Sequence, residues 1–225
     1  MDSVMYEKSP LFSGMNADEI YGMLDCLEAS HSEYDRGETI FHTGDTITRL
    51  GVVLSGSVLI ENDDIWGNRS ILSRVGVGQI FGETYACLPG EPLLISAVAA
   101  ECTRVLLMNM TRLRQPCMNV CARHGRLIAN LLEITARKNL ALSRRILHTS
   151  PKTIRGRLLS YFSELALQTG SRTVVVPFDR QQLADYLSVD RSALSSELSK
   201  MQRDGLLTYN KNTFCLSGAG SDGLE

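Results

Sequence analysis

The sequence lacks the features that would place the protein in a membrane or on a secretory route. No apolar run approaches the roughly 20 residues needed to span a bilayer. The first ten residues include Asp2, Glu7 and Lys8 and form no apolar core of the kind a signal peptide needs. Without such a signal, the six cysteines are expected to be thiols or ligands in a reducing cytosol rather than disulfides. We therefore expect a cytoplasmic protein with no membrane partner.

Catalytic motifs are also missing. The chain contains no Gly-x-Ser-x-Gly sequence, no P-loop and no His-Glu-x-x-His sequence, and Glu83 has no evident base partner. An enzyme is not expected. What is present is typical of a globular protein, with 44% hydrophobic and 21% charged residues. A length of 225 residues is enough for two modest domains, each with a core of its own.

The net charge of −2 hides a difference between the two parts of the chain. Residues 1–147 hold 14 Lys and Arg against 17 Asp and Glu, whereas residues 148–217 hold nine against six. The tail then adds Asp222 and Glu225. A mildly basic C-terminal part fits contact with nucleic-acid phosphates, although the excess is too small to decide the matter.

From about residue 34 to residue 110 the chain consists of short runs rich in Val, Ile, Leu and Thr, separated by glycines. These glycines are Gly37, Gly44, Gly51, Gly56, Gly67, Gly76, Gly78 and Gly82. Regular turns between short strands predict an antiparallel roll or sandwich, with a hairpin tip at residues 64–68. Before it, Asn16 and Glu19 form a capping box that opens a helix.

Helical periodicity returns after Thr111 and lasts to about His148, so we predict a long helix over residues 112–148. Its apolar stripe alternates steps of three and four residues, as in a two-helix coiled coil. The stripe consists of His124, Leu127, Leu131, Ile134, Lys138 and Ala141. A buried helix of a single chain would show the same stripe. A small roll offers too little protein to cover so long a helix, which favours a partner chain at Leu127, Leu131 and Ile134.

A domain boundary is predicted where this helix ends. Ser150 followed by Pro151 is the pattern of an N-cap with proline at the first helical position. We therefore expect a sensor domain with its long helix over residues 1–148 and a second domain over residues 149–217. The Gly- and Ser-rich residues 218–225 are expected to be a disordered tail.

The stretch from Asp179 to Leu207 predicts two short helices joined by a tight turn. Asp179 can cap the first helix, Asp190 can cap the second, and Gly205 can end it. The apolar residues of both helices fall on one face of each. A strand at residues 173–176 precedes them, and a hairpin around Asn210–Asn212 follows, which predicts a wing.

The outward face of the second helix carries small, donor-rich side chains that suit entry into a DNA major groove. The candidate DNA contacts are Gln181, Arg191, Ser192, Ser195, Ser196 and Lys200. The alternative is an ordinary helical hairpin with a solvated serine face.

This segment resembles the helix-turn-helix of the Crp–Fnr superfamily of bacterial transcription regulators. Residues 34–45, 54–58 and 78–83 also resemble segments of that family's cyclic-nucleotide-binding-type β-roll, in the same order and at similar spacing. The resemblance implies an α+β fold. It would comprise an N-terminal antiparallel β-roll of the double-stranded β-helix or jelly-roll type with flanking helices, a long dimerisation helix and a C-terminal winged helix-turn-helix. It also implies a homodimer, a palindromic operator in double-stranded DNA, and RNA polymerase as a partner.

In the family, the roll binds cyclic AMP through a Gly-Glu segment and a later Arg-Ser pair. Here Gly82 and Glu83 are present, but Ile95 and Ser96 align with the second pair. A buried phosphate without its arginine is left uncompensated, so we expect an effector other than cyclic AMP. The resemblance implies that the long helix closes this pocket with Leu127 and Ile128. An uncharged or aromatic ligand is one interpretation, and a roll that has lost ligand binding is the other.

Some members of the family sense signals through an iron–sulfur cluster held by N-terminal cysteines, but here only Cys26 lies in that region. Cys117, Cys121 and His124 share one helical face and could ligate zinc or iron. Three ligands are one short, and Cys102 or a partner chain would have to supply the fourth. The favoured interpretation is that these cysteines are small buried thiols at a dimer seam.

The sequence therefore predicts a homodimeric, sequence-specific DNA-binding transcription regulator, gated by a small-molecule or redox signal. The alternative is a ligand-binding regulatory module without a role on DNA. The effector's identity does not follow from the sequence.

Overall fold

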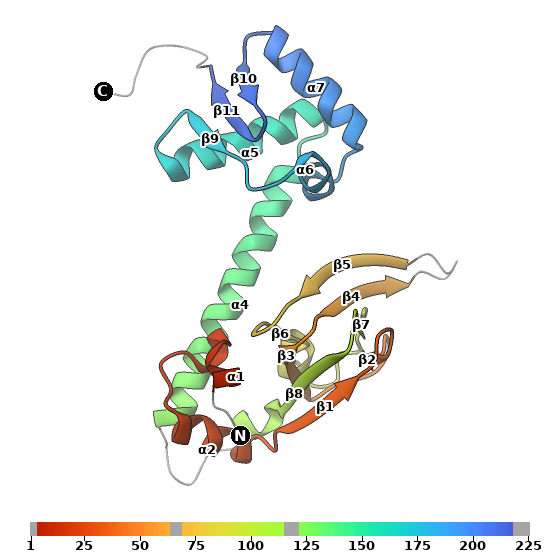
Figure 1. Ribbon diagram of the computed structural model, residues 1–225, viewed down its shortest axis with the longest axis vertical. Coiled ribbons are helices and arrows are strands. Elements are labelled where there is room, and N and C mark those ends of the chain that lie inside the picture. The colour runs from red at the N-terminus through yellow and green to blue at the C-terminus, as the bar shows by residue number, and fades with distance from the viewer. Residues whose placement is uncertain (1–3, 64–68, 115–121, 218–225) are drawn as a thin grey trace. The chain divides into compact units, whose positions relative to one another are not determined.

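The computed structural model describes residues 4–63, 69–114 and 122–217 (Figure 1). It divides into two compact units, residues 1–135 and 136–225, which are described separately here. The predicted hairpin tip at residues 64–68 and the tail at residues 218–225 lie outside the described residues. Among the described helices, none is long and apolar enough to cross a membrane.

Three short helical segments open the first unit: α1 (Val4–Glu7), η1 (Pro10–Phe12) and α2 (Ala17–Cys26). The predicted capping box is confirmed at the start of α2. The side-chain oxygen of Asn16 accepts from the Glu19 amide, and the Glu19 carboxylate accepts from the Asn16 amide, each at 2.9 Å. Fixing this helix end turns Ile20, Met23 and Leu24 toward the core.

Eight strands then form two four-stranded antiparallel sheets with the orders β1-β8-β3-β6 and β2-β7-β4-β5. The strands are β1 (Ser30–Tyr34), β2 (Thr39–Phe41), β3 (Arg49–Ser55), β4 (Val58–Asp63), β5 (Arg69–Val75), β6 (Ile80–Phe81), β7 (Ser96–Ala99) and β8 (Thr103–Asn109). One turn of helix, α3 (Glu83–Cys87), follows β6. The chain passes from one sheet to the other at almost every connection, and among the eight described strands only β4 and β5 are consecutive strands of the same sheet. The predicted antiparallel roll is confirmed.

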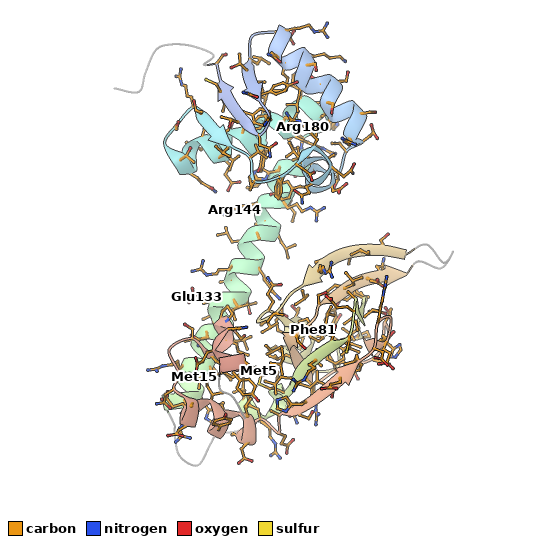
Figure 2. All side chains as sticks on the ribbon, viewed as in Figure 1. Met5, Met15, Phe81, Glu133, Arg144 and Arg180 are labelled. Atoms are coloured by element: carbon orange, nitrogen blue, oxygen red, sulfur yellow. The ribbon has the colours of Figure 1, made fainter. Side chains whose placement is uncertain are left out.

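The apolar inner faces of the two sheets meet in one core. Phe81, labelled in Figure 2, lies at the centre of this core, with its ring 5.5 Å from that of Phe41. Gly51 pairs with Phe81 across β3 and β6, and a Cβ at Gly51 would collide with the Phe81 ring. The missing side chain at Gly51 is therefore what admits the aromatic ring.

The long predicted helix is present as α4 (Ala122–Thr149). Its predicted start at residue 112 was wrong, because residues 110–114 form the 3-10 segment η2 (Met110–Arg114), and residues 115–121 lie outside the described residues. On α4, Leu127 and Leu131 are buried in the same core as α1, η1 and α2. The side chain of Asn130 donates to the backbone oxygens of Leu11 and Ser13, both at 2.9 Å. The first half of α4 is therefore attached to its own unit by one apolar and one polar face.

The second unit contains α5 (Ile154–Thr169), β9 (Thr173–Val175), α6 (Arg180–Leu187), α7 (Arg191–Arg203), β10 (Leu207–Asn210) and β11 (Thr213–Leu216). Its strands form an antiparallel sheet of order β10-β11-β9. Three helices and this small sheet enclose a core that includes Phe162, Leu198 and Phe214. The predicted winged helix-turn-helix is confirmed.

The predicted start of α5 was wrong by three residues. Thr153 is the N-cap, and its hydroxyl accepts from the Gly156 amide at 3.0 Å. The Ser150 hydroxyl instead donates back to the Ile146 oxygen at 2.6 Å, so Ser150 completes the end of α4. Pro151 therefore lies between the helices. The two compact units divide after Thr135, within α4, and the domain boundary near residue 148 stays a prediction.

We expect the core of the second unit to depend on α5, and two leucines of that helix allow a matched test. Leu158 is 0% exposed and Leu167 is 84% exposed. Leu158→Ala should lower the free energy of unfolding by about 2–5 kcal/mol because it leaves a cavity. Leu167→Ala should change it by less than about 0.5 kcal/mol. Urea unfolding followed by circular dichroism measures both, and equal effects would contradict this account of the core.

Candidate nucleic-acid interface and sensor site

The helix pair α6 and α7 is held by local caps at each end. Asp179 and Gln182 form the predicted capping box of α6, with distances of 2.8 and 2.9 Å. Asp190 caps α7 by accepting from the Ala193 amide at 2.8 Å. Hydrogen bonds from the Ser192 side chain and the Ala193 amide lower the pKa of the Asp190 carboxyl group. The caps thus fix where both helices begin, as the sequence predicted.

The turn between the helices requires an unusual backbone angle. Ser188 has a φ of 54° and ends α6, while Gly205, with a φ of 73°, follows the end of α7. Arg157 on α5 stabilises this turn, since its Nη1 donates to the backbone oxygens of Leu187 and Ser188, both at 2.9 Å. The angle between α6 and α7 is therefore held from outside the pair as well as by their shared core.

The outward face of α7 is exposed at every predicted position. Hydroxyls of Ser195 and Ser199 donate back to carbonyl oxygens one turn earlier, each at 3.0 Å. The guanidinium of Arg191 makes no hydrogen bond or ion pair with any described residue. Lys200 lies 4.0 Å from Glu197. The face is therefore a shallow serine surface with a free, bidentate donor near its beginning.

Helix α7 is also attached to α5 through a two-carboxylate ion pair. Arg155 Nε lies 2.6 Å from Glu197, and Arg155 Nη2 lies 2.7 Å from Asp204. Hydrogen bonds to these carboxylates, Glu197 first, raise the pKa of Arg155. Arg155 therefore joins α5 to α7 and to the residue that follows it.

Arg180, labelled in Figure 2, is likewise a structural cation. Its guanidinium lies 5.0 Å from the ring centres of Tyr209 and Phe214, and it donates to the Lys211 oxygen at 3.0 Å. Burial lowers the pKa of Arg180. The contact fixes the wing, whose strands β10 and β11 pair from Leu207 with Leu216 to Asn210 with Thr213. Lys211 occupies the hairpin tip and is exposed.

Gln181, the remaining predicted contact, is exposed on α6, and its amide nitrogen donates to Asp185 at 2.8 Å. The structure thus brings Gln181 and the α7 face onto one helix pair. Sequence reasoning missed Arg155, Arg157 and Arg180, which position that pair. Their long-range partners lie 29 to 49 residues away along the chain, and nothing local in the sequence identifies them.

In the roll, Gly82 and Glu83 stand where β6 passes into α3. Gly82 has a φ of 74°, and a Cβ there would lie 2.9 Å from the Phe41 ring, so only glycine fits without strain. This sharp turn buries Glu83, which is 7% exposed. The predicted effector residue Gly82 therefore adjoins β2.

The second part of the predicted pocket also faces β2. The Ser96 side-chain oxygen accepts from the Thr43 amide at 3.1 Å and lies 2.9 Å from the Thr43 hydroxyl. Ile95, beside it, is half-buried. Thr43 is a further polar group of this site that sequence reasoning missed, although it lies in the segment 34–45 that carried the resemblance.

Three arginines of the roll have carboxylate partners. Arg104 Nε lies 3.0 Å from Glu33, and Arg112 is paired with Glu28. The hydrogen bond to Glu28 is the largest cause of the raised pKa of Arg112. Arg74 lies 3.3 Å from Glu101 and also donates to Ser57. Each of these three guanidinium groups is thus paired with a carboxylate of the same unit, and none of the three pairs includes Glu83.

Comparison with known proteins supports both units. Residues 31–119 match a family described as a cyclic nucleotide-binding domain, and residues 156–217 match a Crp-like helix-turn-helix domain. The chain is 27% identical over 198 residues to the probable transcriptional regulator flp of Lacticaseibacillus casei, covering 88% of this chain and 87% of that protein. It is 22% identical to the cAMP-activated global transcriptional regulator CRP of Haemophilus influenzae, covering 83% and 84%.

Among solved structures, CprK complexed with OCPA has a TM-score of 0.61 at 18% identity, covering 88% of this chain and 91% of that one. This likeness shows the fold. The chain belongs to the Crp–Fnr superfamily. It is a transcription regulator and not an enzyme, since both domains and the relatives are those of regulators.

In this Crp–Fnr regulator, the predicted pocket and dimer residues of α4 divide between two environments. Leu127, Leu131 and Ile134 pack against the amino-terminal helices of their own chain. Ile128 is exposed. Leu127 lies in a different apolar cluster from Phe41 and Phe81, which adjoin the Gly82 turn. The structure therefore does not bring Leu127 into the Gly82–Ser96 group, and the roles of these residues in a dimer stay predictions.

The metal-site prediction for the Crp–Fnr regulator falls partly outside the described residues, because Cys117 and Cys121 belong to the range 115–121. His124 is described, and its Nε2 lies 3.3 Å from the sulfur of Cys26. Cys102 is exposed in the turn between β7 and β8. Within the described part of the chain, no group of three or more His, Cys, Asp or Glu side chains could hold a metal ion.

Proposed function

We propose that this regulator is a homodimer that binds a palindromic operator through α7 and is gated by a small-molecule or redox signal other than cyclic AMP. RNA polymerase is the expected protein partner. The observation that carries the proposal is the exposed α7 face, with the Arg191 guanidinium free among the described residues. A ligand that binds one arrangement of the dimer better would shift the population toward it.

Sequence reading is assigned to the first turn of α7. Arg191 can donate to guanine O6 and N7 together, as guanidinium groups do in the major groove. Ser192 and Ser196 are too short to reach as far, so they favour close approach of the helix. Lys200, nine residues after Arg191 on the same helix, is assigned as a phosphate contact because a flexible ammonium supplies charge without a fixed geometry.

We expect Arg191→Ala to cost about 1–3 kcal/mol of operator affinity and to relax specificity at one base pair per half-site. Lys200→Ala is the matched control on the same helix. It should weaken binding to all sequences alike and reduce the salt slope by about one per protomer. Fluorescence anisotropy with operator and scrambled DNA at several salt concentrations separates the two effects. Arg191→Ala with full affinity and specificity would place the reading surface elsewhere.

The proposed dimer interface is an exposed stripe of residues on α4. It begins at Ile128, one residue after the buried Leu127. Its members repeat at steps of four and three, as in a heptad seam, and all are exposed. They are Ile128, Leu132, Thr135, Asn139, Leu142 and Ile146. Four large aliphatic side chains on one face of a helix favour a covering partner. We take a second copy of this chain as that partner, because the same stripe on both copies is self-complementary.

Two further features of the stripe fit a parallel pair of helices. Asn139 occupies an a position, where a polar residue specifies register and a two-stranded state. The neighbouring e positions hold Ala129, Ala136 and Ser143, which are small enough for the helices to approach closely. Leu131 and Ile134 flank the stripe, so the proposal keeps them near the interface while their side chains pack within the protomer.

Leu142 and Leu140 provide a matched test of this seam, because both are exposed leucines of α4, at 63% and 52%. Leu142 lies on the stripe and Leu140 lies off it. Leu142→Asp should bury an unpaired charge and weaken the dimer by about 3–5 kcal/mol. Leu140→Asp should leave the dimer intact. Sedimentation velocity measures both; a dimeric Leu142→Asp protein, or equal dissociation of the two variants, would move the interface.

The effector is proposed to be uncharged or weakly polar. Ile95 stands where the resemblance places the arginine that pairs with the cyclic phosphate, so this position supplies no cation. Burying a phosphate there would leave its charge uncompensated. The relatives include a cAMP-activated regulator. The proposal that cyclic AMP is not the effector therefore rests on Ile95 and not on membership of the family.

Isothermal titration calorimetry with cyclic AMP and cyclic GMP should show no binding heat at concentrations up to about 1 mM. Ile95→Arg should give measurable cyclic AMP binding if the missing cation is the main obstacle. Ile95→Gln is the control, because it adds length and polarity without charge, and should show none. Tight cyclic nucleotide binding by the unaltered protein would overturn this view of the pocket.

The second candidate function is a ligand-binding regulatory module without a role on DNA. The free Arg191 guanidinium and the cap-fixed helix pair argue for DNA binding. A gel shift with fragmented genomic DNA distinguishes the two. Binding that disappears with Arg191→Ala supports the regulator, and an absence of any retained DNA supports the module.

A further inference from the structure

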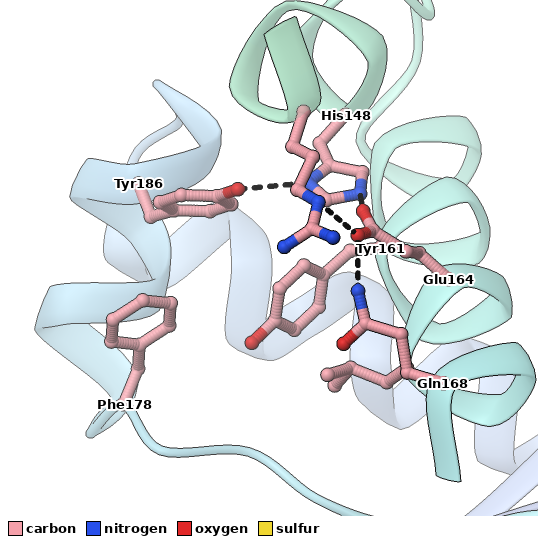
Figure 3. Close-up of a pocket in the computed structure, with 8 residues that line it drawn as sticks. His148, Tyr161, Glu164, Gln168, Phe178 and Tyr186 are labelled. Carbon is pink, nitrogen blue, oxygen red and sulfur yellow. Dashed lines mark hydrogen bonds and ion pairs between the residues drawn. The ribbon is translucent and has the colours of Figure 1, made fainter. Parts of the chain in front are cut away.

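A cavity of about 150 Å³ lies within the second unit, outside the roll and away from the exposed face of α7. Its walls come from the last turns of α4, from α5, and from α6 with the residues before it (Figure 3). The cavity is open to solvent on one side, and its volume is similar to that of an engineered apolar cavity that holds one six-membered ring. The walls are mainly aromatic and aliphatic, contributed by Tyr161, Leu165, Phe178 and Tyr186.

The charged groups of the cavity already neutralise one another. The carboxylate of Glu164 lies 2.9 Å from Arg144 Nε and 2.6 Å from His148 Nε2, and it also accepts from the Gln168 amide. His148 Nδ1 lies 2.9 Å from the Tyr186 hydroxyl. With these partners in place, Glu164 does not require a cationic ligand, and Arg144 and His148 are not free to pair with an anionic one.

Two polar atoms are left over. The hydroxyl of Tyr161 makes no hydrogen bond with any described residue, and the side-chain oxygen of Gln168, an exposed residue at the edge of the cavity, makes none either and is open to solvent. Figure 3 shows the Tyr161 ring between Phe178 on one side and Gln168 on the other. Burial, then the nearby Tyr186 and Glu164, raises the pKa of Tyr161 to about 12, so its hydroxyl stays a donor at neutral pH. One donor and one acceptor therefore border an aromatic cavity.

We propose that this cavity is a second ligand site of the protein, which takes a neutral single-ring phenol. The ring would pack against Phe178 and Tyr186, and its hydroxyl would accept from Tyr161 and donate to Gln168. Such a ligand would contact α4, α5 and α6 together. The site is separate from the proposed effector pocket of the roll, and its occupancy does not depend on DNA binding.

The test uses the full chain and 4-fluorophenol, observed by ¹⁹F NMR. We expect binding in the millimolar range, roughly 1 mM, as for a fragment of this size. Tyr161→Phe removes one hydroxyl without changing the cavity and should weaken 4-fluorophenol about fivefold, the usual effect of one hydrogen bond. Gln168→Met should act similarly. Tyr209→Phe is the control, since it makes the same change in β10, outside the cavity.

Fluorobenzene completes the design because it lacks the hydroxyl. It should bind the parent and Tyr161→Phe equally, which shows that the altered cavity is intact. The proposal is overturned by an absence of binding at about 5 mM 4-fluorophenol, by unchanged affinity in both cavity variants, or by an equal loss in Tyr209→Phe. Operator binding by the same samples is measured separately, so failure of DNA recognition and failure of this site give different results.

Discussion

Burial of Leu127 and Leu131 against the amino-terminal helices determines which face of α4 is left for anything else. Once that face is covered, the 28-residue helix can present to a partner only the sides that remain. Ile128 and Leu132, the next residue after each buried leucine, then become exposed. Hydrophobic burial within the protomer thus determines which residues of α4 are left exposed for the proposed dimer.

The sequence predicted a coiled-coil stripe on α4 that includes Leu127, Leu131 and Ile134, and these residues pack within the protomer. Leu127 and Ile128 both begin runs with steps of three and four, because 3.6 residues per turn places neighbouring runs on neighbouring faces. Periodicity therefore reveals that the helix is apolar on two sides. The core that selects one of them contains Phe12 and Ile20, more than 100 residues earlier. Only tertiary packing resolves such a choice, and the same limit explains why the polar anchor of Asn130 was not foreseen.

Local chemistry explains what was predicted correctly. The caps at Asn16, Asp179 and Asp190 each act over three residues, so side-chain type and spacing suffice to place helix starts. The start of α5 was missed although it is equally local, because Ser150 and Thr153 both fit an N-cap pattern. In the structure the Ser150 hydroxyl donates to the Ile146 backbone oxygen at the end of α4, so Thr153 is the residue that caps α5. In the roll, Gly82 was located through resemblance, whereas the Thr43 contact to Ser96 spans 53 residues and left no signal in the pattern.

The same reasoning changes how the basic excess of the second unit should be understood. Counting charges treats all cations alike, yet Arg155, Arg157 and Arg180 are half-buried and committed to carboxylates, carbonyl oxygens or aromatic rings. A guanidinium held in this way positions a helix or the wing and has little freedom to reach a phosphate. The cations that remain exposed include Arg191 and Lys200, which lie at opposite ends of the reading helix. The proposed recognition therefore relies less on net charge than on a few exposed donors, carried by a helix that structural arginines hold in place.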